Sequence, residues 1–180
     1  MRAKLALLCL FLFASQARAD ARISEIKINL DGDRVLATFT LRDAFNQRFR
    51  ERVESGLPTP ILYRFELARD RKRWWDEKLK TNTLEVAATY DAVARAYNVH
   101  YRLDGELIES RTVRELKDLE EAMTEVRNLP VFSLAGLPDR WRLLVKVQAE
   151  MGSRTMLSFI PVTINTDWKE SSKFHAPKQP

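Results

Sequence analysis

Residues 69–80 combine the side chains best suited to contact chemistry in this chain. Six basic and three acidic residues surround two adjacent tryptophans. Arginine offers a bidentate fork and tryptophan a large rigid surface, so both are enriched where partners bind. An anionic lipid headgroup or an acidic protein face would suit such a segment. Its candidate binding residues are Arg69, Arg71, Arg73, Trp74, Trp75 and Asp76.

A structural interpretation of the same segment stays open. Residues 69–80 lie between two expected strands, so they can form a hairpin connection whose charges pair locally. One tryptophan would then cover the end of the fold. The adjacent Asp76 and Glu77 also suit the acid and nucleophile of a glycosidase. Carboxylates in a basic loop are more simply ion-pair partners, so a glycan-active enzyme is the less favoured alternative.

Other catalytic and metal-binding patterns are sparse. The chain has two histidines, and neither His100 nor His175 has partners at metal-ligand spacing. Ser24 and Lys27 match the Ser-x-x-Lys spacing of penicillin-binding enzymes. They lie in an expected strand, however, where positions i and i+3 point to opposite faces. We therefore predict no catalytic residues, no bound metal and no cofactor, and we favour a protein that is not an enzyme.

The first nineteen residues predict export. Two basic residues precede an apolar run over residues 5–14, and Ala17-Arg18-Ala19 forms a small-x-small cleavage site. This is typical of a secretory signal peptide cleaved after Ala19, because the apolar run is too short to span a bilayer. Its removal lowers the formal charge from +5 to +2, so nucleic acid is not an expected partner. The sole cysteine, Cys9, lies in this leader, so no disulfide is expected.

Alternating apolar residues predict about seven strands along the rest of the chain. Two Asp-Gly pairs, Asp31-Gly32 and Asp104-Gly105, predict tight turns. The expected strands cover residues 26–30, 35–41, 61–67, 84–90, 97–103, 141–149 and 159–168.

Helical spacing of apolar residues predicts two short helices between these strands. The first is capped by Asp43 and ends at Gly56. The second begins with a capping-box pair, Thr112 and Glu115, and is closed by Pro130.

Together these elements predict an antiparallel β-sandwich, immunoglobulin-like or C2-like, with two inserted helices. The alternative is an α+β fold with both helices on one face of a single sheet. The expected organisation is a signal peptide (residues 1–19), one globular domain (20–168) and a flexible C-terminal tail (169–180). The apolar strand faces also allow a second functional hypothesis, a carrier that holds a lipid or other amphiphile between the sheets or beneath a helix.

A succession of short motifs resembles one known family. The motifs are Leu-Arg-Asp-Ala-Phe at 41–45, Glu-Ser-Gly-Leu-Pro-Thr at 54–59, Arg-x-Arg-x-x-Trp-x-Asp-Glu-Lys at 69–78 and Thr-Asp-Trp at 166–168. They resemble the exported proteobacterial proteins known as domain of unknown function 4390, over nearly all of the mature chain. The resemblance implies a Gram-negative periplasmic protein with no assigned activity or catalytic residues.

Genes of that family often lie beside those of membrane sensor histidine kinases, so the resemblance implies an accessory role to a sensor. Our leading hypothesis is a periplasmic binding or interaction domain that contacts a membrane-anchored protein, such as a sensor histidine kinase, through residues 69–80. An anionic lipid headgroup is the other expected contact.

Overall fold

The computed structural model describes residues 20–71, 75–156 and 160–177. Within these ranges, only the backbone is described for residues 153–156 and 160–163. The predicted signal peptide lies outside the described residues, as do Arg73 and Trp74 of the candidate binding segment. Among the described residues, no helix is long and apolar enough to cross a bilayer.

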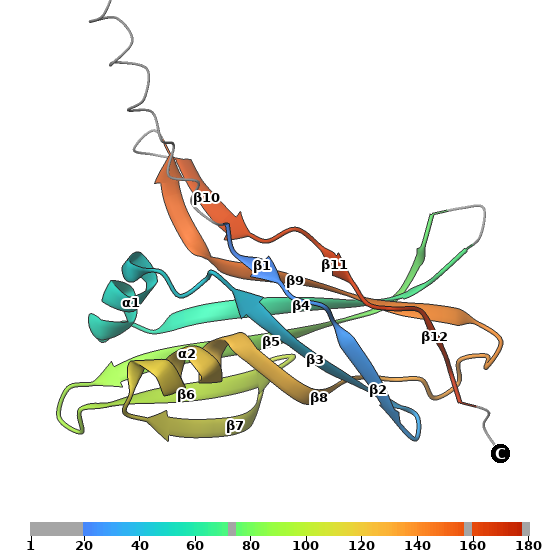
Figure 1. Ribbon diagram of the computed structural model, residues 1–180, viewed down its shortest axis with the longest axis horizontal. Coiled ribbons are helices and arrows are strands. Elements are labelled where there is room, and N and C mark those ends of the chain that lie inside the picture. Colours follow the sequence, from blue (N-terminus) through green and yellow to red (C-terminus); the bar gives the residue numbers. More distant parts are fainter. Residues whose placement is uncertain (1–19, 72–74, 157–159, 178–180) are drawn as a thin grey trace, which may run out of the picture.

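The described chain folds into two antiparallel sheets. In the smaller sheet three strands pair with one central strand, and the elements are β1 (Arg22–Ile23), β2 (Lys27–Asp31), the central β3 (Arg34–Arg42) and β8 (Glu125–Ser133). Figure 1 shows this sheet lying across one face of the larger one.

The larger sheet has a continuous path of six strands. In spatial order they are β10 (Ile160–Asn165), β9 (Arg142–Met156), β4 (Thr59–Arg69), β5 (Glu77–Asp91), β6 (Ala96–Leu103) and β7 (Glu106–Val113). Two further short strands, β11 (Lys169–Glu170) and β12 (Phe174–His175), also pair with β9.

The core lies between the two sheets, where alternate side chains of facing strands meet. Phe39 of β3 packs edge-on against Tyr63 of β4, with ring centroids 5.4 Å apart, and lies 6.0 Å from Phe65. All three rings are buried. The predicted sandwich with two inserted helices is therefore confirmed, and the single-sheet alternative is wrong.

Helix α1 (Gln47–Glu54) begins later than predicted. Its N-cap is Asn46, whose Oδ1 accepts a hydrogen bond from the Phe49 backbone N–H at 3.1 Å. Asp43 was expected at this position, but it has a φ of 60° and forms an ion pair with Arg22. Both residues are good N-caps, and the choice between them depends on where the chain leaves β3.

Helix α2 (Leu116–Thr124) also differs at both ends. The predicted capping box does not form, because Thr112 belongs to β7 and its hydroxyl contacts Asn98 instead. The position before the helix, Glu115, makes no side-chain cap. At the other end the chain passes directly into β8, so Pro130 lies within a strand, paired with Leu36.

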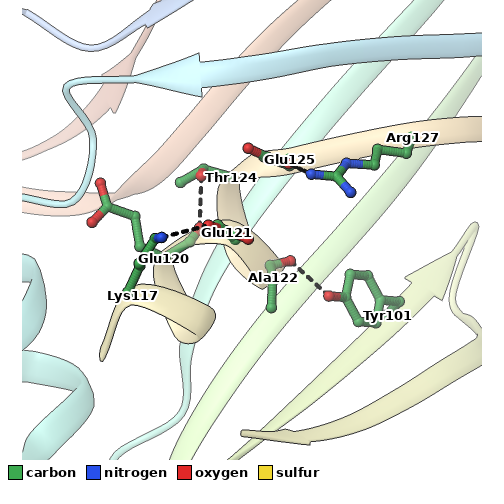
Figure 2. Close-up of polar contacts among 8 residues, drawn as sticks. All are labelled: Tyr101, Lys117, Glu120, Glu121, Ala122, Thr124, Glu125 and Arg127. Atoms are coloured by element: carbon green, nitrogen blue, oxygen red, sulfur yellow. Dashed lines mark hydrogen bonds and ion pairs between the residues drawn. The ribbon is translucent and has the colours of Figure 1, made fainter. Parts of the chain in front are cut away.

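Two tyrosines of the larger sheet hold the C-terminal end of α2. The Tyr63 hydroxyl donates to the Met123 carbonyl at 2.8 Å, and the Tyr101 hydroxyl donates to the Ala122 carbonyl at 2.6 Å. The last four carbonyls of a helix have no partner within it. The two tyrosine hydroxyls donate hydrogen bonds to two of these carbonyls, as Figure 2 shows for Tyr101.

The C-terminal segment was predicted to be a flexible tail, yet most of its described part pairs with β9. The Ser171 backbone N–H donates to the Val145 carbonyl at 2.9 Å, and the Ser171 hydroxyl accepts from the Val145 N–H at 3.0 Å. With β11 before it and β12 after it, this segment covers part of the outer edge of β9. Exposed edge strands are commonly blunted in this way.

Candidate functional site

The β4–β5 hairpin carries the candidate segment. Arg69 pairs with Glu77 at the last described ladder position, and a bulge lies between Leu67 and Ala68. Figure 1 shows this end of the hairpin extending away from the smaller sheet. We call residues 69–71 and 75–80 the hairpin end.

Asp70 ties the hairpin end to β9 and to the C-terminal segment. Its carboxylate contacts the Arg142 guanidinium and lies 3.0 Å from Lys173 Nζ. The Asp70 side chain is only 9% exposed, and its backbone N–H donates to the Arg142 carbonyl at 2.8 Å. The hydrogen bonds from Lys173 and Arg142 hold the pKa of the Asp70 carboxyl below its ordinary value.

Asp76 is held in a second group of charges. Lys146 of β9 lies 2.8 Å from an Asp76 oxygen and 2.8 Å from a Glu170 oxygen of β11. Partial burial acts to lower the pKa of Lys146, but the hydrogen bonds to Asp76 and Glu170 outweigh it and raise that pKa above its ordinary value. The ammonium therefore stays charged and links the hairpin end to two neighbouring strands.

The two described candidate arginines are also engaged. Arg71 forms an ion pair with Glu77, and Arg69 Nη1 lies 3.7 Å from the same carboxylate. The Arg69 guanidinium also lies over the ring of Trp141, 4.2 Å from its centroid. Trp141 was not among the candidate residues, because the sequence showed it only as the start of the strand at 141–149.

Trp75 differs from these neighbours, because its side chain is 93% exposed. Arg69, Arg71 and Asp76 form ion pairs within the protein, as the structural interpretation of the segment predicts. The hairpin end thus has charged side chains fixed by contacts and a tryptophan presented to solvent. Arg73 and Trp74 lie outside the described residues.

A cavity of about 410 Å³, lined mostly by charged residues, lies at the base of the hairpin end. Basic side chains outnumber the single carboxylate in its lining, which is made by Arg69, Asp70, Arg140, Trp141, Arg142 and His175. Because the Asp70 carboxylate is already shared by Arg142 and Lys173, the local field of this cavity favours an acidic partner.

The remaining candidates for chemistry lie apart from one another. His100 Nδ1 lies 2.9 Å from the Ser110 hydroxyl on β7, away from the hairpin end. The Ser24 hydroxyl accepts from the Thr40 backbone N–H at 2.9 Å. Within the part of the chain that the structure describes, no three His, Cys, Asp or Glu side chains are grouped as metal ligands.

Comparison with known proteins gives one match. The family model described as domain of unknown function (DUF4390) matches residues 18–175. No curated protein and no solved structure matches the chain.

Proposed function

Because this chain belongs to the DUF4390 family, whose function is unknown, we propose a role from its own geometry. We propose that it is an exported, non-enzymatic binding module of the periplasm. It contacts a membrane-anchored partner protein through the hairpin end. Sensor histidine kinases are the first class of partner to test.

The exposure of Trp75 is the observation that carries this proposal. A tryptophan side chain that is 93% exposed leaves a large apolar surface in water. Burial of such a side chain at the centre of an interface typically contributes about 2–4 kcal/mol. Trp75, which is far more exposed than the other exposed tryptophan of the described residues, Trp168 at 41%, is therefore best explained as an anchor that enters a pocket of the partner.

The fixed charges around Trp75 support the same role. Asp70 and Asp76 tie the two legs of the hairpin to β9, so these two described positions are already fixed before a partner arrives. Pre-ordering reduces the entropy that association costs. The excess of basic side chains in the adjacent cavity favours an acidic rim on the partner.

A site-specific cross-linking experiment in living cells tests this proposal. A photo-reactive phenylalanine analogue replaces Trp75, and the matched control carries it at Val93, which is 98% exposed in the turn after β5. We expect one discrete membrane protein to be captured from position 75 and not from position 93. Equal capture from both positions, or no capture from position 75, would contradict the proposal.

Single substitutions then separate the anchor from the structural charges. Trp75→Ala should weaken binding of the captured partner by about thirtyfold or more, which corresponds to at least about 2 kcal/mol. Arg71→Ala should weaken it much less, because Arg71 is paired with Glu77. A larger loss with Arg71→Ala would assign the contact to the charges instead.

Export is tested independently of the partner. We expect the protein recovered from the periplasm to begin at Asp20, which an intact mass measurement detects as the loss of residues 1–19. A full-length mass in a cytoplasmic fraction would contradict the location but not the contact surface.

A further inference from the structure

A second cavity, of about 310 Å³, lies between helix α2 and the strands at one side of the sandwich. Strands β5, β6, β7 and β8 and helix α2 all contribute to it. Its lining includes Leu84, Tyr101, Ile108, Asp118, Glu121 and Val126. Figure 2 shows Tyr101 below the end of α2, with Glu125 and Arg127 on the adjoining strand.

The inner wall of this cavity is apolar. Leu84, Ala122 and Val126 are buried there, and Ile108 on β7 is 49% exposed. The polar atom of the Tyr101 side chain is already used, because its hydroxyl donates to the Ala122 carbonyl. An apolar group could therefore enter without leaving that hydroxyl unpaired. The volume lies at the lower end of the usual range for small-molecule sites, about 300–1,000 Å³.

Both arginines of the cavity are neutralised by neighbours. Arg111 makes two hydrogen bonds to Glu109, at 2.5 and 3.1 Å, and its guanidinium lies over the Tyr101 ring, 5.1 Å from the centroid. The hydrogen bond to Glu109 is the main cause that raises the pKa of Arg111. Arg127 is paired with Glu125 on the same strand.

Two further carboxylates of α2 line the same cavity. Glu121 has only a distant contact with Lys117, at 3.9 Å, and that lysine is largely exposed. Asp118 has no ion pair with any other described residue. After the arginines are neutralised, the lining therefore keeps a negative charge beside an apolar wall.

We propose that this cavity binds a single-chain amphiphile with a cationic head. Its alkyl chain lies against Leu84, Val126 and Ile108, and its head lies beside Asp118 and Glu121. Burial of the alkyl chain supplies the affinity. The two carboxylates favour a positively charged head group over a negatively charged one. This site is separate from the hairpin end and does not rest on the function proposed there.

Calorimetric titration with three twelve-carbon detergents, each below its critical micelle concentration, tests the assignment. The probes are dodecyltrimethylammonium, the uncharged dodecyl maltoside and dodecyl sulfate. We expect saturable binding of one dodecyltrimethylammonium per chain and weaker binding of the other two. Equal or tighter binding of dodecyl sulfate would overturn the charge assignment, and no saturable binding of dodecyltrimethylammonium would overturn the site.

Two matched variants locate the head group. Asp118→Asn/Glu121→Gln should weaken dodecyltrimethylammonium binding by about fivefold, as expected for the loss of two partly exposed charge interactions. Glu106→Gln/Asp139→Asn changes the net charge equally at exposed positions outside the cavity, and should leave binding unchanged. Equal weakening by both variants would show a diffuse charge effect and overturn the assignment.

A third variant locates the alkyl chain. Ile108→Ser removes a half-exposed wall residue, so the fold should tolerate it, and it should weaken binding of all three detergents alike. Unchanged binding would overturn the placement of the chain. Light scattering on the same samples checks the other occupant: a dimer that dissociates when detergent is added would identify a second copy of the protein and overturn the proposal.

Discussion

The Tyr63 hydroxyl should be one of the more costly single groups to remove from this fold. Tyr63 is fully buried in β4, and its hydroxyl donates to the Met123 carbonyl near the end of α2 at 2.8 Å. This contact joins the larger sheet to the helix that leads into β8 of the smaller sheet. We predict that Tyr63→Phe destabilises the protein although the ring remains.

The size of the effect follows from what the substitution leaves behind. A typical hydrogen bond contributes about 1 kcal/mol, but a buried group that loses its partner costs about 1–3 kcal/mol. We therefore expect a loss of about 2 kcal/mol in the free energy of unfolding. For a domain of this size that corresponds to a fall of about 4–8 °C in Tm. Tyr101→Phe should cost about 1 kcal/mol, because Tyr101 borders the open second cavity and water can replace its hydroxyl.

Urea unfolding followed by circular dichroism measures these differences. Tyr90→Phe is the matched control, because Tyr90 is half-buried and its hydroxyl has no hydrogen-bond partner among the described residues. The control should lie within about 0.5 kcal/mol of the parent protein. If Tyr63→Phe is no more destabilising than Tyr90→Phe, the proposed support of the helix end is refuted.

The same variant should show a characteristic pH dependence. Burial raises the pKa of Tyr63 far above the ordinary value of 10.0. Above pH 10 the unfolded chain releases the Tyr63 proton while the folded protein keeps it, so the parent protein loses stability as the pH rises. Tyr63→Phe lacks this loss. The difference between the two proteins should therefore shrink by about 1.4 kcal/mol at pH 11, and a constant difference would contradict a neutral, buried phenol.

Three further predictions test local features. Asn46→Ala should cost about 1 kcal/mol in urea unfolding, and Asp43→Asn should cost less than about 0.5 kcal/mol, because Asn46 caps α1. Asp70→Asn should lower the unfolding midpoint at pH 6, and the difference should fade below about pH 3.8, because the depressed pKa of Asp70 stabilises the fold only while its carboxyl is ionised. Gly152→Ala should cost about 1–3 kcal/mol in the same urea assay, because Gly152 has a φ of +67°, a backbone conformation that strains any residue with a Cβ.

Strands that bury one face could be predicted from the sequence. Residues 35–41 and 61–67 alternate because their apolar side chains enter the core between the sheets, and they lie within β3 and β4. The Asp104-Gly105 turn was also correct, since both residues adopt the positive φ that such a turn requires. In these segments local pattern and tertiary environment agree.

The missed strands lack that agreement. Seven of the eight side chains of β7 are exposed, so neither face carries an apolar stripe. In β8 the alternation is interrupted by Asn128, which has a φ of 48°, and by Pro130. The short strands β11 and β12 are held by backbone pairing with β9, which depends on a neighbour rather than on side-chain pattern. Tertiary contacts therefore determine these segments.

The candidate binding segment shows the same division within a single hairpin. Composition identified residues 69–80, but it could not tell which charges were committed, because their partners are distant in sequence: Asp70 is held from β9 and the C-terminal segment, and Asp76 from Lys146. Among the described candidates, only the Trp75 side chain is left almost fully exposed. Arg69 and Arg71, which first suggested recognition, are thus paired with Glu77 within the hairpin, and the binding energy that we propose is assigned to Trp75.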